Sequence, residues 1–593
     1  MKSNNRITSF LRLKFPVAFL AIVAMSVVLS SCEPEEEQGD PPTLSLSVET
    51  AINTVGTTVA TEVTLNAPEG LKTLNILKNG VSFQTQSYTG ELTATLNFEY
   101  TIEELVPGTV VNFTFQAIDM LDRTSPIRTF AVTVASRQIV EVSGEITGDV
   151  TWTNDKIWRL NGFVRVQDGA KLNIEPGTLI IGDRESKGTL VVQMGGQIFA
   201  EGTRDEPIVM TSERGPGLRE PGDWGGLVIC GRARNNVTVV TGLPVELEGG
   251  YGAFHGGTND DDNSGIVRFV RIEFAGIPIN PNEEVNSLTM GSVGRGTIIE
   301  NVQLSFGLDD GFEWFGGTVD HRYLIVYRGL DDDFDIDLGY TGRVQFALSI
   351  RASTLADQSG ANSFEVDNNG AGSAAEPFTS GVFANVTVIG PKKNRDLPIS
   401  LQFHNAAHLR RNARLSIYNS FMTGFPFGLF IDDDRPGSGQ AALDGHLQIR
   451  NLILAGVEHW GGNGYGAAGT IFSGAPANGL QHPTNPRGAA LRSHANFPGG
   501  HEAYTNWFNT TEFGNLQLDH WGLAGIDGSI FDIGLPKMTP NAGSMLLTNA
   551  NWNNCPKAVN DPFFQKVDFI GAFGATDWTE GWTEWNSHLV EYF

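Results

Sequence analysis

The stretch Leu308-Asp309-Asp310-Gly311-Phe312-Glu313-Trp314-Phe315 returns 22 residues later as Leu330-Asp331-Asp332-Asp333-Phe334-Asp335-Ile336-Asp337, and its core returns again as Ser363-Phe364-Glu365-Val366-Asp367. Repeats of about 20 to 30 residues, built from short strands and Gly, Asn or Asp turns, are typical of solenoids. Within each copy a phenylalanine and the acidic residue after it must point to opposite faces of a strand. The repeat therefore predicts a β-solenoid whose phenylalanines stack inward.

The same register predicts a ladder of carboxylates on the outer face. Equivalent residues of a parallel solenoid stack about 4.8 Å apart, and two bare carboxylates about 5 Å apart repel by about 3 kcal/mol at an effective dielectric of about 20. A bound cation, neighbouring arginines or raised pKa values would each relieve this repulsion. Because Ca²⁺ prefers carboxylate oxygens, we expect a calcium site on the ladder. Its candidate ligands are Glu313, Asp335 and Glu365, with Asp337 and Asp367 beside them.

The composition favours an all-β protein. The chain has 593 residues and a formal net charge of −27, yet only 18% of its residues are charged. It also lacks long runs of Ala, Glu, Lys and Leu at helical spacing, which argues against an all-α fold. The acidity and the lack of a basic patch argue against a nucleic-acid partner. Cys230 and Cys555 lie more than 300 residues apart, and this spacing does not establish whether they pair.

The N-terminus has the pattern of a lipoprotein leader. Four basic residues precede an apolar run at 15–29, which ends in Leu29-Ser30-Ser31-Cys32. The run is short for a membrane span, and small residues before a cysteine are typical of a lipobox. We therefore predict a signal peptide at residues 1–31, lipidation of Cys32 and an acidic tether at 32–40. An ordinary signal peptide or a membrane anchor is the alternative.

Three further regions follow the tether. Residues 41–135 show short alternating strands and a Lys78-Asn79-Gly80 hairpin signal, which predicts an Ig-like β-sandwich. Two-residue alternation with turn signals continues over 139–460 and predicts the solenoid. Residues 461–593 lose this periodicity, and we expect long loops and a C-terminal cap packed back along the solenoid. A β-propeller would require blade signatures that the chain does not show.

Several phrases resemble known families. Leu172-Asn173-Ile174-Glu175-Pro176-Gly177-Thr178 resembles the right-handed parallel β-helix of the pectin-lyase-like superfamily. The phrases Pro221-Gly222-Asp223-Trp224-Gly225-Gly226 and Trp578-Thr579-Glu580-Gly581-Trp582-Thr583 look like a family of Bacteroidota outer-membrane β-helix lipoproteins of uncharacterised function, often labelled "multidrug transporter". The resemblance spans about residues 140 to 593, and it implies a right-handed parallel β-helix but no established activity.

The acidic tract after Cys32 is similar to the surface-export signal of those lipoproteins, although it lacks the usual start of that signal. We therefore expect a lipid-anchored protein of the outer membrane, facing the cell surface, with the periplasmic face as the alternative. The expected partners are the membrane itself, an extracellular ligand such as a glycan, and an outer-membrane protein.

Two other constellations bear on chemistry. Asp260-Asp261-Asp262-Asn263-Ser264-Gly265 approximates a calcium loop through Asp260 and Asp262, or is a solvated turn. Asp309-Asp310 resembles the aspartate pair of polygalacturonases, but the Gly-His-Gly and Arg-Ile-Lys motifs of those enzymes are absent.

Arg328, Arg343 and Arg351 lie within one or two coils of the ladder, where they would supply a lyase base or simply neutralise the carboxylates. We expect a calcium-stabilised β-helix that binds an extracellular ligand. The alternative is a polysaccharide lyase or glycoside hydrolase that uses Asp309, Asp310, Asp335 and Arg343.

Overall fold

The computed structural model describes residues 39–457, 465–466, 470–471 and 497–593, except residues 282, 395–396, 434, 436 and 533. The leader and Cys32 lie outside the described residues. Among the described residues, no helix is both long and apolar enough to cross a membrane.

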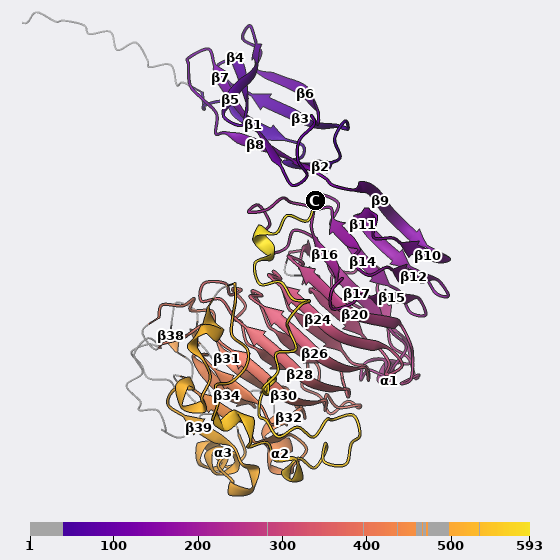
Figure 1. Ribbon diagram of the computed structural model, residues 1–593, viewed down its shortest axis with the longest axis vertical. Coiled ribbons are helices and arrows are strands. Elements are labelled where there is room, and N and C mark those ends of the chain that lie inside the picture. The colour runs from indigo at the N-terminus through magenta and orange to yellow at the C-terminus, as the bar shows by residue number, and fades with distance from the viewer. Residues whose placement is uncertain are drawn as a thin grey trace, which may run out of the picture.

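Residues 43–134 form a β-sandwich, which lies at one end of the molecule (Figure 1). In β3 every second residue is buried, so one face of the strand packs on the core and the other meets solvent. The core contains Phe98, Phe113, Phe115 and Phe130. One sheet consists of β1 (Thr43–Leu46), β3 (Thr58–Asn66) and β6 (Thr93–Thr101), and the other of β2 (Thr50–Asn53), β8 (Arg128–Val134), β7 (Val110–Asp119), β4 (Leu71–Lys78) and β5 (Val81–Ser87).

The rest of the described chain is built on a 25-stranded parallel sheet wound into a β-helix, as the repeat predicts. Its strands pair from coil to coil in three ladders. The first ladder, which carries the acidic residues, consists of β14 (Thr189–Val192), β17 (Gly226–Cys230), β23 (Leu288–Gly291), β25 (Phe312–Phe315), β27 (Phe334–Asp337), β29 (Phe364–Val366), β31 (Asn405–Arg410) and β34 (Phe427–Asp432).

The second and third ladders share several long strands. These are β20 (Gly265–Glu273), β24 (Ile298–Ser305), β26 (Asp320–Tyr327), β28 (Arg343–Ile350) and β30 (Val382–Ile389), and each contains a residue with φ between 50° and 64°. Shorter strands complete the second ladder: β10 (Asp149–Trp152), β12 (Lys171–Ile174), β15 (Gln197–Glu201), β32 (Ser416–Tyr418) and β35 (Gln448–Arg450). The third ladder adds β13 (Leu179–Gly182), β16 (Ile208–Ser212), β33 (Phe421–Thr423), β36 (Ile453–Ala455) and β39 (Leu516–Leu518), and both β9 (Gln138–Ile146) and β11 (Lys156–Val166) open the helix.

The inward row of phenylalanines is in register. Phe312 pairs with Phe334, which pairs with Phe364, and all three side chains are fully buried. Ring centroids lie 6.1 Å apart for the first pair and 5.0 Å for the second. Burying each such ring contributes about 1.5–3 kcal/mol, so this stack holds the acidic strands in place.

The C-terminal segment covers the outer face of the third ladder. It includes β39, which extends the parallel sheet beyond residue 460, and 3-10 helices at Trp521–Ala524, Gly528–Phe531, Met545–Leu547, Trp552–Asn554 and Ser587–Leu589. Phe573, Trp582 and Trp585 pack on outward apolar residues such as Tyr327 and Ile350. The segment then runs back to the first coils, where Phe593 lies beside the sandwich (Figure 1).

An insertion made of two loops, residues 231–264 and 274–287 on either side of β20, covers the outer face of the early coils in the first ladder. Its elements are α1 (Thr238–Thr241), β18 (Val245–Glu246), β19 (Phe254–His255), β21 (Pro278–Asn280) and β22 (Glu283–Glu284). The remaining elements are α2 (Ser438–Leu443), β37 (Tyr465–Gly466), β38 (Thr470–Ile471), α3 (Gly500–Phe508) and the 3-10 helix Thr511–Phe513. Cys230 and Cys555 are both buried and unpaired, so the pairing that the spacing left open does not occur.

Candidate functional site

The predicted carboxylate ladder lies on the outer side of the first ladder of strands. Glu313 pairs with Asp335, and Asp335 pairs with Glu365. Thr289 precedes Glu313 in this row, and His408 follows Glu365. Along the solenoid, the row therefore begins with an uncharged threonine, continues with three carboxylates and ends with the imidazole of His408.

The turns that lead into β25 and β27 add more carboxylates to the same place. Three groups form, in each of which the carboxylate oxygens lie within 4.8 Å of one another. Together these groups contain seven residues, which we call the acidic cluster. Its members are Asp309, Asp310, Glu313, Asp331, Asp332, Asp335 and Glu365.

Backbone and amide groups hold part of the acidic cluster. The amide N–H of Asp332 donates to Asp310 Oδ1 at 2.8 Å, and the amide N–H of Asn362 donates to Asp332. The Asn362 side chain donates to Glu365 Oε2 at 3.2 Å. Among the described residues, none donates a hydrogen bond to the carboxylate of Asp335. Asp335, the central residue of the ladder, therefore has Glu313 on one side and, on the other side, Glu365, which is paired with Arg410.

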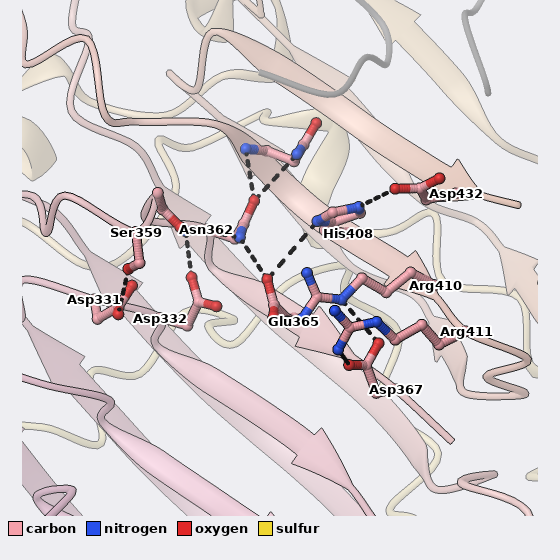
Figure 2. Close-up of polar contacts among 12 residues, drawn as sticks. Asp331, Asp332, Ser359, Asn362, Glu365, Asp367, His408, Arg410, Arg411 and Asp432 are labelled. Atoms are coloured by element: carbon pink, nitrogen blue, oxygen red, sulfur yellow. Dashed lines mark hydrogen bonds and ion pairs between the residues drawn. The ribbon is translucent and has the colours of Figure 1, made fainter. Parts of the chain in front are cut away.

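Two arginines neutralise the far end of the ladder (Figure 2). Arg410 forms ion pairs with Glu365 and with Asp367, the latter at 2.8 Å, and Arg411 also pairs with Asp367. His408 Nε2 lies 3.0 Å from Asp432, and its Nδ1 lies 3.8 Å from Glu365. This end of the ladder is a closed ion-pair network.

Apart from Glu365, no member of the acidic cluster forms an ion pair among the described residues, and the pKa values of these members move accordingly. Burial and then the neighbouring carboxylates raise the pKa of Asp310, Glu313 and Asp335 well above the usual range of carboxylic acids. The same two causes act on Asp309 and Asp332. Burial raises the pKa of Asp331 to about 7. Without a cation, the charged form of these carboxyls is therefore disfavoured in the folded protein.

The acidic cluster borders a groove of about 740 Å³. Glu248 and Glu284 of the insertion line it together with Asp309 and Asp331, and Asp357 also lines it from the loop before β29. Burial and then the other groove carboxylates raise the pKa of Glu248 and of Glu284. Uncharged polar side chains complete the lining, namely Gln358, Ser359 and Gln402.

The donor set fits a hard divalent cation. Carboxylate and amide oxygens are the ligands that Ca²⁺ takes, six to eight at a time. Beside Glu313, which is 6% exposed, lies Asn286, which is 2% exposed and whose amide donates to Glu313. Its Oδ1 has no hydrogen-bond partner among the described residues. A buried amide oxygen without a donor is costly, and a cation would satisfy it.

The structure gathers only some of the residues predicted as ligands or catalysts. Asp337 lies two residues after Asp335 on β27, and burial and then Asp367 raise its pKa to about 7. Asp260 instead pairs with Arg234, and Asp262 accepts a hydrogen bond from the amide of Arg232 at 2.8 Å. Arg343 pairs with Asp320 and, at 2.9 Å, with Asp561. These last three therefore have other partners than the acidic cluster.

Five acidic residues of the cluster or the groove are absent from the prediction. Asp331 and Asp332 repeat the positions of Asp309 and Asp310, so the repeat itself could have identified them. Glu248, Glu284 and Asp357 lie in loops without periodicity, and no local signal places them near the ladder.

Comparison with known families agrees with this architecture. A family described as "Pectate-lyase like beta helix domain" matches residues 144–468, which is more than half of the chain. The chain belongs to this family. The matched range contains the whole acidic cluster and the groove, and the family points to a role related to carbohydrates.

Other comparisons add little. No curated protein matches the chain. A solved structure titled "Structures of Clostridium thermocellum CbhA fibronectin(III)-like modules" is similar to 16% of this chain and 96% of that chain, at 14% identity and a TM-score of 0.12. That likeness is too weak to bear on fold or function.

Proposed function

We propose that the acidic groove binds an extracellular glycan through calcium held by the acidic cluster. The observation that carries this proposal is the set of seven carboxylates whose central member, Asp335, receives no hydrogen bond from the described residues. Such a set does not stabilise the folded protein, because repulsion within each close pair of charged carboxylates costs about 3 kcal/mol at an effective dielectric of about 20. A role in binding would explain it.

Calcium would supply the missing positive charge. Asp310, Glu313 and Asp335 form one of the close groups, and Glu313 accepts a hydrogen bond from Asn286, whose Oδ1 has no partner among the described residues. A second close group, formed by Asp309, Asp310 and Asp331, opens on the groove. A cation there would have free positions for hydroxyl or carboxylate oxygens of a sugar.

The groove also suits a polar ligand. Ser359 and two glutamines offer donors and acceptors along its rim, and Ser359 already donates to Asp331 at 2.8 Å. Hydroxyl-rich sugars pair well with such groups. The family's carbohydrate-related role supports this choice of ligand class.

The contacts favour binding over catalysis. A lyase base must be deprotonated, but hydrogen bonds from Arg343 to Asp320 raise the pKa of that arginine. Burial lowers the pKa of Arg410, yet Glu365 and Asp367 outweigh it and raise the pKa overall. An inverting hydrolase needs two carboxyls about 6.5–9.5 Å apart, whereas oxygens within each close group lie within 4.8 Å.

A glycan-binding assay tests the proposal. The purified protein is applied to an array of bacterial and plant polysaccharides with calcium or with a chelator, and Asp335→Asn is compared with Asp205→Asn, which removes an exposed carboxylate elsewhere on the solenoid. We expect calcium-dependent binding that Asp335→Asn lowers at least about tenfold and Asp205→Asn preserves. Binding that survives both chelation and Asp335→Asn would refute the role of the cluster.

Turnover is measured on the same ligands. We expect neither unsaturated uronides nor new reducing ends. Reproducible product formation by the wild type that Asp335→Asn abolishes would favour the lyase or hydrolase alternative instead.

The proposal also includes a lipid anchor on Cys32, an outer-membrane location and exposure at the cell surface, with the sandwich as a spacer. The lipobox and the acidic tract carry this part. A diacylated and N-acylated cysteine holds a protein firmly on a bilayer. Cys32→Ala should therefore move the protein out of the washed membrane fraction, and retention of the variant there would contradict the anchor.

A further inference from the structure

A second, basic pocket lies at the corner of the solenoid that follows the third ladder. Successive coils place equivalent residues there in one row, because Phe306 N–H donates to Tyr327 O at 3.0 Å, Arg328 N–H to Ile350 O at 2.8 Å and Arg351 N–H to Ile389 O at 2.9 Å. The row reads Phe274, Phe306, Arg328, Arg351, Gly390. Aromatic side chains thus give way to two arginines and then to a residue without a side chain.

The aromatic part of this row supports the first arginine. The rings of Phe274 and Phe306 stack with centroids 5.1 Å apart, and the guanidinium of Arg328 lies 5.2 Å from the Phe306 centroid. Tyr327 also contacts this guanidinium, at 5.7 Å. Stacking of this kind limits the positions open to a guanidinium before any ligand arrives.

A cavity of about 190 Å³ is lined by both arginines. Its other polar lining groups are Ser353, Thr354, Lys393, Asp532 and Tyr327. Lys393 pairs with Asp532 at 2.9 Å, so these two charges offset each other. Arg351 pairs with Asp333 at 2.7 Å and donates to the carbonyl of Asp331 at 2.6 Å. Arg328 has no ion pair among the described residues.

Both arginines also carry an unsatisfied donor. Nε of Arg328 and Nε of Arg351 are buried and have no hydrogen-bond acceptor among the described residues. The Arg351 residue is 5% exposed, so water does not readily compensate for the missing acceptor. The Arg351 side chain is wholly buried, so Arg328 is the arginine that can offer guanidinium N–H groups to a ligand in the cavity. A partly exposed guanidinium that has no ion pair among the described residues, in a chain of net charge −27, requires an explanation of its own.

We propose that this pocket binds a small oxyanion, namely a sulfate, phosphate or carboxylate group. Guanidinium groups recognise these anions through paired N–H donors, and each charge-assisted bond is stronger than a neutral one. The hydroxyls of Ser353 and Thr354 would complete the shell, and the volume suits one such group rather than a whole sugar chain. The pocket shares no lining residue with the acidic groove, and the proposed anion binding does not require calcium.

Calorimetric titration tests this inference in a chelating buffer, so that the calcium proposal plays no part. Sodium sulfate, phosphate and acetate are titrated separately at constant ionic strength set with chloride, and the arm that binds identifies the anion. We expect saturable one-site binding of at least one anion, weakened about tenfold or more in Arg328→Gln because a charge-assisted bond is lost. Arg295→Gln, which removes an exposed arginine paired with Asp261, should bind as the wild type does.

Two further variants keep the test decisive. Arg328→Lys keeps the charge but loses the planar fork and should bind with intermediate affinity. Lys393→Gln should weaken binding less than Arg328→Gln, because Lys393 already has a carboxylate partner; it also replaces Arg328→Gln if that variant fails to fold. No binding of any of the three anions by the wild type, or equal binding by Arg328→Gln and Arg295→Gln, would overturn the proposal.

Discussion

The two ends of one carboxylate ladder solve the same electrostatic problem differently. At Glu365 and Asp367, two arginines supply the counter-charge and close an ion-pair network. One coil earlier, at Asp335, no described residue donates a hydrogen bond, and the pKa is raised by burial and by neighbouring acids. Stacked carboxylates are therefore not a signature of function by themselves. The difference lies in whether the chain brings its own cations to them.

The largest expected effect concerns the neutralised end. Arg410→Ala leaves Glu365 and Asp367 partly buried beside each other with only Arg411 and His408 nearby, and breaking such buried pairs typically costs about 3–5 kcal/mol. We expect a loss near the lower figure, because 22% of the Arg410 side chain is exposed. Denaturant unfolding measures it, with Arg295→Ala as the exposed control. Equal stabilities of the two variants would show that the network is not structural.

The pH dependence should expose the uncompensated end. The pKa of Asp331 rises from 3.8 to about 7 on folding, mainly through burial. A raised carboxyl pKa means that the folded protein binds the proton more tightly than the unfolded chain does. The stabilising contribution of Asp331 is therefore fully present below about pH 4 and is lost as the pH rises to about 7.

For metal-free protein, we expect Asp331 alone to contribute a fall of about 2–3 kcal/mol, since one pKa unit corresponds to about 1.4 kcal/mol and partial exposure reduces the full value. Unfolding in a chelating buffer at pH 4 and pH 7 measures the fall, and Asp331→Asn should reduce it. A variant whose pH profile matched that of the wild type would contradict the raised pKa.

Calcium should stabilise the folded protein only through the uncompensated carboxylates around Asp335. At a free concentration about 100 times its Kd, a ligand that binds the folded state alone stabilises it by about 2.7 kcal/mol. We expect calcium to raise the melting temperature of the wild type and of Arg411→Ala, but not of Asp335→Asn. Chelation that left the wild-type melting curve unchanged would remove calcium from the proposed function.

The sequence anticipates the ladder but not its surroundings. The alternation of Phe334 and Asp335, repeated at Phe312 and Glu313, is a local pattern, and backbone pairing alone converts it into stacked rows. The cations are not local, because Arg410 lies 45 residues beyond Glu365 in the chain and reaches it only through the next coil. Glu248 comes from an insertion whose path no periodicity describes. Local patterns thus predict which carboxylates stack, while loops and later coils decide which remain uncompensated.

The smallest expected effect distinguishes the two parts of the ladder most directly. The same isosteric substitution, aspartate to asparagine, should change the free energy of unfolding in opposite directions at Asp335 and at Asp367. In metal-free protein at pH 7, folding must either bury the Asp335 charge among acidic neighbours or bind a proton there, and Asp335→Asn removes this cost, so we expect a gain in stability of about 1–2 kcal/mol. Asp367→Asn instead removes the partner of Arg410 and Arg411, and we expect a loss of about 1–2 kcal/mol, moderated because Arg410 keeps Glu365.

Both variants are measured by denaturant unfolding at pH 7 in a chelating buffer. Saturating calcium should then abolish the gain in Asp335→Asn relative to the wild type while leaving the loss in Asp367→Asn. Changes of the same sign would mean that both rungs are neutralised alike, and the cluster would then need no cation.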